Sequence, residues 1–442
     1  MAEIFLGGYF GNSVNFGGTT LTNNGGVDSF FSKIDENGNT IWITQFDSTS
    51  TVIGHDIKPF SDGSSITVGE FSGTANFGSS SLTSSGNEDA FIVKLDSNGN
   101  VTWRKNFGGS AACRAYSATA LADGSSIIVG HFGGGTATFG SSSLTANSDS
   151  DGFVTKLDSN GDVVWIKQFE GAGSAHVRVW DIKSFNDGSS IVTGWFTGST
   201  TFGDTTLTSN GGLDSFVTKL DSSGNVVWAK SIGEAGGDQG YDISLLSDGG
   251  VAITGYFTGS ISHGGTTLTS AGSYDAYVTK LDSNGDRVWI KRFGGVELDE
   301  PLEINSLSDD SLIITGFFRD TASFGATNLT SNGGTDAFIL KLDSSGNVLW
   351  AKSFGGTGFD KFDGTTIESD NSYLISGEFK SSVNIGGTTY NAGSHLLRVD
   401  NNGNVSYVTG YTGSEVLINA LNLRDSTAPT FSSAATNTAG TK

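Results

Sequence analysis

A tryptophan recurs at an almost fixed spacing along this chain and limits the folds open to it. The positions are Trp42, Trp103, Trp165, Trp228, Trp289 and Trp350, at steps of 61, 62, 63, 61 and 61 residues. Tyr407 takes the corresponding place 57 residues later. Ten residues around each tryptophan repeat as a phrase, which reads Lys-Leu-Asp-Ser-Asn-Gly-Asn-Val-Thr-Trp at 94–103. Repeats of this regularity indicate an array of similar structural units.

Each unit contains four stretches with the character of β-strands. In one unit these are residues 241–246, 251–257, 276–281 and 287–292. Ser-Asp-Gly at 247–249 and Asp-Ser-Asn-Gly-Asp at 282–286 are turn signals, and no run shows helical periodicity. A Gly/Ser/Thr stretch separates the second and third strands. Four antiparallel strands repeated around an axis are typical of a β-propeller, in which stacked units bury the surface that a lone unit could not.

The two ends of the chain complement each other. A Gly-aromatic-Phe phrase marks the second strand of most units and first occurs at Gly8-Tyr9-Phe10. The last unit has a first strand near 417–423 but no second strand, so residues 3–10 can supply it. We therefore expect an all-β fold: a single closed seven-bladed β-propeller over residues 1–425, with four antiparallel strands per blade. Residues 426–442 are expected to form a flexible tail or interdomain linker.

The repeat resembles the bacterial seven-bladed propeller repeat called SBBP. The likeness lies in the Lys-Leu-Asp-x-x-Gly-Asn-x-x-Trp phrase, in Phe-Gly-Gly at 354–356 and in the Gly-x-Phe-x-Gly strand, and it covers nearly residues 3–425. It implies part of an exported or surface bacterial protein. Thr-Ala-Pro-Thr-Phe-Ser at 427–432 is similar to the opening of repeat domains in large cyanobacterial surface proteins, which implies that the chain belongs to something larger.

A second resemblance concerns a cofactor. Asp158-x-x-Gly161-x-x-x-Trp165 is similar to the tryptophan-docking motif of quinoprotein propellers, but the spacing is one residue shorter. The single cysteine, Cys113, cannot form the vicinal disulfide found in many of those dehydrogenases. We therefore expect no cofactor, and we expect Cys113 to be a small buried residue.

Charge and hydropathy narrow the range of partners. The chain has 24 Lys and Arg against 46 Asp and Glu, a net charge of −22, which opposes binding to nucleic-acid phosphates. No apolar run is long enough to span a membrane, and Met1–Ile4 lacks the layout of a classical signal peptide. We expect an extracellular or cell-surface protein that is a monomer or part of a larger chain.

Catalytic and metal-binding motifs are absent from the sequence. It has no nucleophile elbow, no zinc-protease motif and no phosphate-binding glycine loop. The five histidines fall in different units, which disfavours a metal triad: His55, His131, His176, His263 and His395. Asp158, Asn160 and Asp162 present oxygens at alternate positions, as calcium requires, but a hairpin turn explains the same residues. The aspartates that begin six third strands are expected to be hydrogen-bond acceptors within the blades: Asp28, Asp89, Asp151, Asp214, Asp275 and Asp336.

A binding site is expected where the repeats differ. The fourth-to-first and second-to-third connections share one face and vary, whereas the turns of the other face hardly change. The candidate ligand-binding residues on the variable face are Arg114, Tyr116, His176, Arg178, Trp180, Tyr241 and Lys361. The first strands should also place acidic residues in the channel at one shared position: Asp56, Asp181, Asp242 and Glu303.

These features favour a non-enzymatic binding or interaction module that takes a glycan or protein ligand on its variable face. Two alternatives stay open. The propeller can be a passive structural spacer, or the channel carboxylates can serve a glycan hydrolase or lyase.

Overall fold

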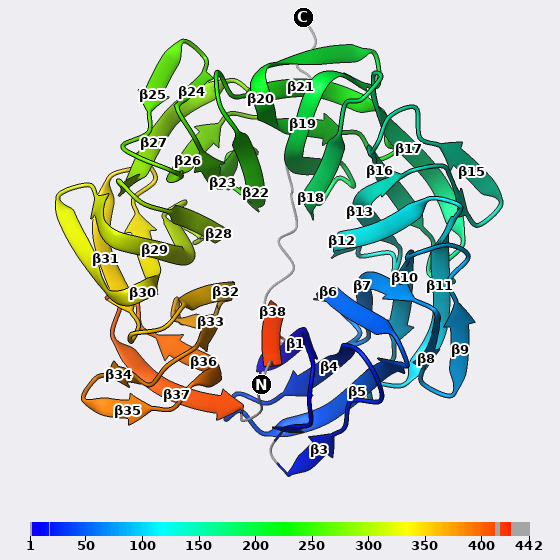
Figure 1. Cartoon of the computed structure of the whole chain (residues 1–442), viewed down its shortest axis with the longest axis horizontal. Coiled ribbons are helices and arrows are strands. Elements are labelled where there is room, and N and C mark those ends of the chain that lie inside the picture. The colour runs from blue at the N-terminus through cyan, green and yellow to red at the C-terminus, as the bar shows by residue number, and fades with distance from the viewer. Residues whose placement is uncertain (1, 17, 412–415, 426–442) are drawn as a thin grey trace, which may run out of the picture.

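The strands of this protein are arranged radially. The computed structural model describes residues 2–16, 18–411 and 416–425, and in these residues it contains β-strands, turns and loops but no helix that could cross a membrane. Figure 1 shows sheets placed around a central opening, each running from the opening to the perimeter. Successive strands of each sheet pair antiparallel. The chain is thus a β-propeller built from repeats.

Groups of four antiparallel strands, here called blades, follow one another along the chain. The strand nearest the centre is called the first strand. One blade joins both chain ends: β38 (Val416–Asp425), β1 (Ala2–Phe10), β4 (Asp28–Ile34) and β5 (Thr40–Ser48). The next are β6 (Thr51–Pro59), β7 (Ser65–Ser72), β10 (Asp89–Leu95) and β11 (Val101–Gly109); then β12 (Ala112–Ala120), β13 (Ser126–Gly133), β16 (Asp151–Leu157) and β17 (Val163–Gly171).

The remaining blades keep this order. They are β18 (Val177–Ser184), β19 (Ser190–Phe202), β20 (Thr205–Leu220) and β21 (Val226–Ile232); β22 (Asp238–Leu245), β23 (Val251–Phe257), β26 (Asp275–Leu281) and β27 (Arg287–Gly295). Next come β28 (Asp299–Ser306), β29 (Leu312–Phe324), β30 (Thr327–Leu342) and β31 (Val348–Phe354); then β32 (Asp360–Ile367), β33 (Tyr373–Phe379), β36 (Gly393–Val399) and β37 (Val405–Tyr411).

The expected pairing of the chain ends is present. β1 pairs antiparallel with β38, from Ala2 opposite Asp425 to Phe10 opposite Val416, and on its other side with β4. The N-terminal strand therefore serves as the second strand of the blade that the C-terminal strand begins. The expected tail, residues 426–442, lies outside the described residues.

The Gly/Ser/Thr stretch between second and third strands folds into a hairpin that was not predicted from the sequence. These hairpins are β2 (Val14–Phe16) with β3 (Thr19–Leu21), β8 (Thr74–Phe77) with β9 (Ser80–Thr83), β14 (Thr136–Phe139) with β15 (Ser142–Thr145), β24 (Ser260–His263) with β25 (Thr266–Thr269), and β34 (Val383–Ile385) with β35 (Thr388–Tyr390). In β19–β20 and β29–β30 the hairpin continues the longer strands.

Four of these hairpins pair with the outer strand of the preceding blade. β8 pairs with β5, the outer strand of the preceding blade, and β14 pairs likewise with β11. Phe77 of β8 is fully buried, and its ring centroid lies 4.9 Å from that of Phe46 in β5. Threonine pairs such as Thr74 and Thr83 face solvent on the other side of the hairpin. The hairpins therefore fasten neighbouring blades together at the perimeter.

The repeated tryptophans join neighbouring blades. The indole Nε1 of Trp103 donates a hydrogen bond to the carbonyl oxygen of Ser159, in the hairpin loop of the next blade, at 2.9 Å. Gly161 of that loop has a φ of +80°, and a Cβ there would lie 2.9 Å from the Trp103 ring. Only glycine satisfies both the left-handed backbone and this close contact. The Asp-x-x-Gly phrase and the tryptophan are therefore two halves of one contact.

The cores lie between the sheets. Phe31 and Phe46 of one blade pack with Phe91 of the next, with ring centroids 6.4 Å and 5.9 Å apart. Every residue of β4 is buried, and its adjacent Phe30 and Phe31 point to opposite faces of the sheet, so this third strand contacts both neighbouring blades. This stacking holds the first strands close around the axis.

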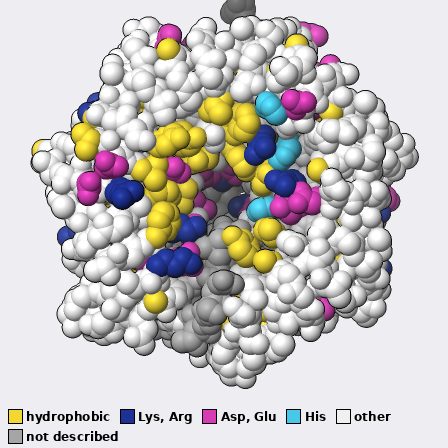
Figure 2. Space-filling model, in the orientation of Figure 1, with side chains coloured by type: hydrophobic (Ala, Val, Ile, Leu, Met, Phe, Trp, Pro, Cys, Tyr) yellow, Lys and Arg dark blue, Asp and Glu magenta, His cyan; other side chains and the backbone are white. Residues whose placement is uncertain are grey.

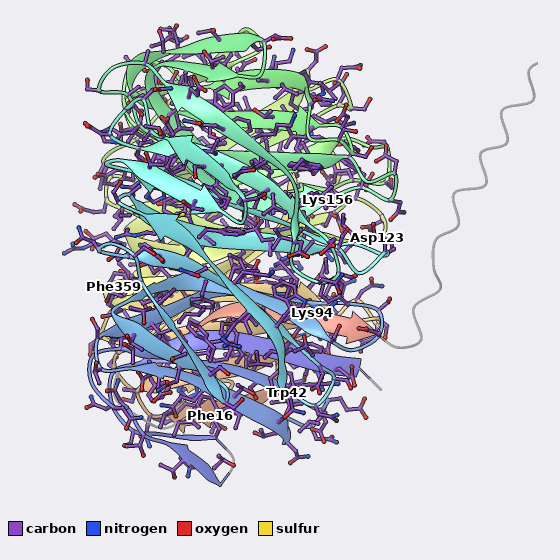
Figure 3. All side chains as sticks on the ribbon, turned by 90° about the vertical axis from the view of Figure 1, so that its right-hand side faces the viewer. Phe16, Trp42, Lys94, Asp123, Lys156 and Phe359 are labelled. Atoms are coloured by element: carbon purple, nitrogen blue, oxygen red, sulfur yellow. The ribbon has the colours of Figure 1, made fainter. Side chains whose placement is uncertain are left out.

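The molecule has two distinct faces. Figure 3 shows Phe359, in a fourth-to-first connection, on one side of the molecule and Asp123, in a first-to-second turn, on the other. The expected division of the connections between the two faces is therefore present. The face that carries Phe359 is called the variable face below.

Candidate functional site

One residue in each first strand is displaced from the strand ladder. In β6 the pairing with β7 shifts between Gly54 and Asp56, which leaves His55 without an opposite residue. Such a bulge bends the strand and redirects the side chain of the extra residue. The displaced residues whose side chains the structure describes are His55, Tyr116, Trp180, Tyr241, Leu302 and Asp363.

The displaced side chains converge on a cavity of about 190 Å³. All six line it, together with the acidic residues that follow them in the first strands. Figure 2 shows hydrophobic, basic, acidic and histidine side chains gathered around the central hollow, whereas the surrounding face is mostly of other types. The predicted residues Tyr116, Trp180 and Tyr241 thus come together at this hollow, which we call the channel mouth.

Tyr116 is the centre of an aromatic cluster in the channel mouth. Its ring centroid lies 4.3 Å from that of Trp180 at an interplanar angle of 54° and 5.0 Å from that of His55. On its outer side it stacks with His131 at 5.4 Å. Burial raises the pKa of the Tyr116 phenol and holds that of the His131 imidazole well below its ordinary value, so both side chains are neutral at pH 7.

A second ring of side chains surrounds the first, and the sequence analysis missed it. These residues occupy the middle position of the Gly-x-Phe phrase in the second strands: Tyr9, Glu70, His131, Trp195, Tyr256, Phe317 and Glu378. Arg178 lies opposite Trp195, and Lys361 lies opposite Glu378, in the strand ladders. The signal was available, because this middle position varies while its glycine and phenylalanine neighbours stay constant.

Most cations of the channel mouth have a carboxylate partner. Arg114 forms ion pairs with Glu70 at 3.1 Å and with Glu88 at 2.6 Å. Lys361 forms one with Asp363 at 2.7 Å. Arg114 and Lys361 therefore lie near the channel mouth, but carboxylates of the chain already neutralise their positive charges.

Arg178 differs from these cations. Its guanidinium lies over the indole of Trp195, 5.2 Å from the ring centroid, in a cation–π arrangement. No ion pair joins it to a carboxylate among the residues that the structure describes. The predicted His176 lies at the rim, 3.8 Å from an Asp149 carboxylate oxygen and 6.4 Å from Trp195 between ring centroids.

Tyr241 stands on the other side of the mouth. Its hydroxyl donates a hydrogen bond to Oε2 of Glu300 at 3.4 Å, and its ring packs edge-on against Tyr256. Burial, and then the nearby Glu300 carboxylate, raise the pKa of Tyr241 above its ordinary value. The phenol therefore remains a hydrogen-bond donor at physiological pH.

The four predicted channel acids lie deeper than the aromatic residues. Asp242 and Glu303 line both the channel mouth and a second cavity of about 150 Å³ that the aromatic side chains do not reach. Each acid directly follows the bulged residue of its strand, so the four acids occupy equivalent positions in their blades. The acids also line the channel mouth, which therefore combines aromatic, basic and acidic side chains.

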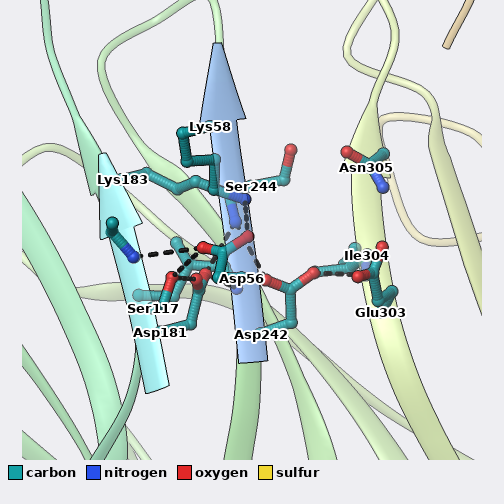
Figure 4. Close-up of polar contacts among 12 residues, drawn as sticks. Asp56, Lys58, Ser117, Asp181, Lys183, Asp242, Ser244, Glu303, Ile304 and Asn305 are labelled. Atoms are coloured by element: carbon teal, nitrogen blue, oxygen red, sulfur yellow. Dashed lines mark hydrogen bonds and ion pairs between the residues drawn. The ribbon is translucent and has the colours of Figure 1, made fainter. Parts of the chain in front are cut away.

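These acids link neighbouring first strands (Figure 4). Each accepts a hydrogen bond from a backbone N–H in the next blade: Asp56 from Ala118 at 3.1 Å, Asp181 from Ile243 at 3.2 Å, Asp242 from Ile304 at 2.8 Å and Glu303 from Thr365 at 2.8 Å. The carboxylates therefore satisfy backbone donors that would otherwise be buried without a partner.

A lysine balances part of this charge. Lys183 lies 2.7 Å from Oδ2 of Asp181 and 3.0 Å from Oδ1 of Asp242. Burial and the neighbouring carboxylates raise the pKa of Asp242, and burial raises that of Glu303 to about 7. The pKa of Asp181 is low because Lys183 lies beside it. A second ammonium, that of Lys58, lies 3.1 Å from Oδ1 of Asp56, so the acids of the ring share two lysines.

The Asp-x-Asn-Gly loops use their carboxylates internally. Oδ1 of Asp158 accepts the backbone N–H groups of Asn160 and Asp162, both at 2.9 Å. Asp162 pairs instead with Lys105 of the preceding blade. These contacts are those of a turn, and the described residues contain no cluster of three or more side chains suited to a metal ion.

The third-strand aspartates and Cys113 have structural roles in the folded chain. The repeated third-strand aspartates accept hydrogen bonds from the loop before them, as Asp28 does from the N–H of Asn24 and Asp336 from that of Asn332. Cys113 is fully buried, and burial raises the pKa of its thiol, which makes it unreactive.

Comparison with known protein sequences gives distant relatives. No family model matches the chain. An uncharacterized WD repeat-containing protein of Acanthamoeba polyphaga mimivirus is 24% identical over 448 residues, covering 83% of this chain and 32% of that protein. The regulatory protein FlaEY of Caulobacter vibrioides is 28% identical over 153 residues, covering 33% of this chain and 16% of that protein. The chain thus spans about a third or less of these curated relatives.

Solved structures give weaker likenesses. The WD40 domain of Neurospora crassa Pan2 is 11% identical with a TM-score of 0.41, covering 83% of this chain and 86% of that one. Synechocystis apocarotenoid oxygenase is 10% identical with a TM-score of 0.47, covering 96% and 92%. A sialidase of Streptococcus pneumoniae is 11% identical with a TM-score of 0.37, covering 84% and 64%. The likeness to SBBP repeats and to cyanobacterial linkers stays a prediction.

Proposed function

We propose that this protein is a non-enzymatic binding module, built as a closed seven-bladed propeller, that takes a glycan or protein ligand at the channel mouth. The pairing of β1 with β38 supports closure of the ring. The repeat spacing and the run of four-stranded blades support the count of seven.

One observation carries this proposal. The bulge places one side chain from each of six first strands at the channel mouth, and those side chains differ in kind from blade to blade. The opposite face repeats the same turns and the same tryptophan contacts. A scaffold with no ligand has no need for aromatic and charged groups that converge on one cavity, whereas a binding site does.

The test is binding of the purified chain to a broad array of bacterial and algal glycans, beside the double variant Arg178→Ala/Trp180→Ala. A bound glycan that the variant loses would support a binding module with its site at the channel mouth. A protein partner captured by the parent chain but not by the variant would support the same site. Equal behaviour of both chains in every assay would favour a passive spacer instead.

The enzymatic alternative rests on the deep acids. A carboxyl with a pKa of about 7, as in Glu303, is suited to general acid catalysis. The hydrogen bonds of all four acids to backbone N–H groups of the next blade favour a structural role. Release of shorter products from any glycan that the chain binds, abolished in Asp242→Asn while binding persists, would establish a hydrolase or lyase.

We also propose that the module acts outside the cell or at its surface, as a monomer or as part of a larger protein. The resemblance to SBBP repeats supports this location, and the net charge of −22 favours repulsion between copies. Cell fractionation and light scattering of the purified chain test the two statements.

A further inference from the structure

One carboxylate of the variable face has no cation beside it. The Glu300 side chain, in β28, accepts a hydrogen bond from the hydroxyl of Tyr241 at 3.4 Å, and within the described parts of the chain it forms no ion pair with a lysine or arginine. At the same position of other first strands, Arg114 has two glutamate partners and Lys361 has Asp363. Burial raises the pKa of the Glu300 carboxyl, and a cation placed beside it would oppose that shift.

A row of three tyrosine rings begins at this carboxylate. The ring centroid of Tyr241 lies 5.5 Å from that of Tyr256, and Tyr256 lies 4.8 Å from Tyr274, with interplanar angles of 62° and 88°. Burial, and next the charge of Glu300, raise the pKa of the Tyr256 phenol, which shows that the carboxylate lies near this second ring as well. Glu300 and the three tyrosines are each partly exposed. Aromatic rings beside an accessible carboxylate are suited to a cationic group, which the ring faces attract.

The surface next to the tyrosine row is apolar. Val296 is 66% exposed and Phe359 is 41% exposed, and both lie in fourth-to-first connections of the variable face. The residue before Tyr274 donates its N–H to the carbonyl oxygen of Val296 at 3.3 Å. The ring centroid of Phe359 lies 5.3 Å from that of Phe317, which stands opposite Glu300 in the strand ladder. Figure 2 shows a run of hydrophobic side chains along one side of the central hollow and the histidine side chains on the other.

This combination favours a protein partner over a glycan. The aliphatic and phenyl side chains of Val296 and Phe359 offer no hydrogen bond to a sugar hydroxyl, whereas apolar side chains of a protein gain free energy by covering them. In protein interfaces, a centre of aromatic and charged residues is commonly surrounded by contacts that exclude water. A carboxylate covered in this way is costly unless an opposite charge pairs with it. A partner that covers Glu300 must therefore bring a cation.

Resting on the proposed binding function, we infer that the variable face binds a protein segment that places an arginine or lysine side chain against Glu300 and the tyrosine row and covers Val296 and Phe359 with apolar side chains. A neutral glycan leaves the charge of Glu300 unpaired, and an acidic glycan is repelled by it. The net charge of −22 also favours association with a basic partner.

The experiment measures, by fluorescence anisotropy, binding of the chain to a library of fluorescein-labelled dodecapeptides that carry one central arginine or lysine among varied apolar residues. Each peptide that binds is compared with its uncharged match, in which citrulline replaces arginine or acetyl-lysine replaces lysine. We expect the uncharged peptide to bind about tenfold more weakly, as for the loss of a close charge pair at an interface. Glu300→Gln should weaken the charged peptide as much and abolish the difference between the two peptides. Asp204→Asn, which removes the same charge at the exposed perimeter, should leave binding unchanged.

The outcomes that contradict this site differ from those that contradict the binding function. Peptides whose affinity changes neither on loss of their charge nor in Glu300→Gln would overturn the inference, because the cation would then lie elsewhere. If no peptide binds, but a glycan does and Arg178→Ala/Trp180→Ala abolishes its binding, the inference is wrong and the binding function stands. If neither peptides nor glycans bind, both are wrong. Glu300→Gln keeps an oxygen to accept the Tyr241 hydroxyl, and unchanged circular dichroism and melting temperature show that each variant is folded.

Discussion

The two ends of the central channel differ in how their side chains are used. On the face opposite the mouth, six blades repeat one contact, in which a tryptophan packs on the glycine of the next hairpin loop, as Trp165 does on Gly224 and Trp228 on Gly285. At the mouth, the equivalent bulge carries a histidine, a tyrosine, a tryptophan, a leucine or an aspartate. The difference shows that the fold determines where the bulged side chain lies at the mouth but does not determine which residue type lies there.

The perimeter hairpins should show the largest effect on stability. Phe202 is fully buried and lies 4.8 Å from Phe169 and 4.7 Å from Phe216 between ring centroids. Phe202→Ala should lower the free energy of unfolding by about 3–5 kcal/mol, as expected for a buried phenylalanine. Trp180→Ala, at the half-buried mouth, should cost only about 1–2 kcal/mol because less surface is lost. Urea titration followed by fluorescence or circular dichroism measures both.

The same two substitutions should affect ligand binding in the opposite order. Phe202→Ala should retain the affinity for any ligand of the channel mouth below its melting temperature, and Trp180→Ala should lose it. If Trp180→Ala destabilised the protein as much as Phe202→Ala, the mouth would be part of the structural framework and the contrast between the two regions would fail.

A buried acid at the start of a first strand should make stability depend on pH. Asp238 begins β22 and is fully buried, and burial, with repulsion from Asp214, raises its pKa to about 8. An unfolded aspartate titrates near pH 4. The folded chain therefore holds this proton more tightly, and the contribution of Asp238 to stability falls as the pH rises from about 4 towards 8.

The isosteric variant Asp238→Asn removes that ionisation and keeps an oxygen to accept the N–H of Glu234. We expect it to raise the free energy of unfolding by roughly 1–2 kcal/mol at pH 8 and to have little effect at pH 4, because an unpaired buried charge is absent there. Urea titrations at both pH values, with the exposed Asp204→Asn as control, provide the measurement. An equal effect at both pH values would show that Asp238 does not ionise in this range.

The repeated parts of the molecule could be predicted from the sequence because each contact recurs in several blades. Trp103 and Gly161 both belong to the repeated ten-residue motif, so their contact recurs wherever the motif does. Alignment of the units on that motif also places Asp56 and Asp181 at the same position. The perimeter hairpins were missed because each strand has one or two apolar residues, such as Ala75 and Phe77, among serines and threonines.

The second ring of the mouth was missed for a different reason. Trp195 and Arg178 lie on different strands, and only the antiparallel ladder shows that they face each other. The bulge could not be predicted either, because it is a register shift that no residue type demands. Reading the sequence could identify Tyr116, Trp180 and Tyr241 as variable, but their convergence on one cavity depends on the backbone.

The smallest expected effect tests the repeated contact itself. The indole Nε1 of Trp228 donates to the carbonyl oxygen of Ser283 at 3.3 Å, whereas that of Trp165 has no acceptor among the described residues. Both rings pack on a loop glycine at nearly the same distance. Phenylalanine keeps most of that packing and removes the N–H. Trp228→Phe should therefore destabilise the chain by about 0.5–1 kcal/mol more than Trp165→Phe, the net value of one hydrogen bond. Paired urea titrations measure the difference. Equal losses of stability would mean that ring packing alone joins the blades on this face and that the hydrogen bond to the carbonyl oxygen adds nothing. The two ends of the channel would then differ only in the identity of their side chains.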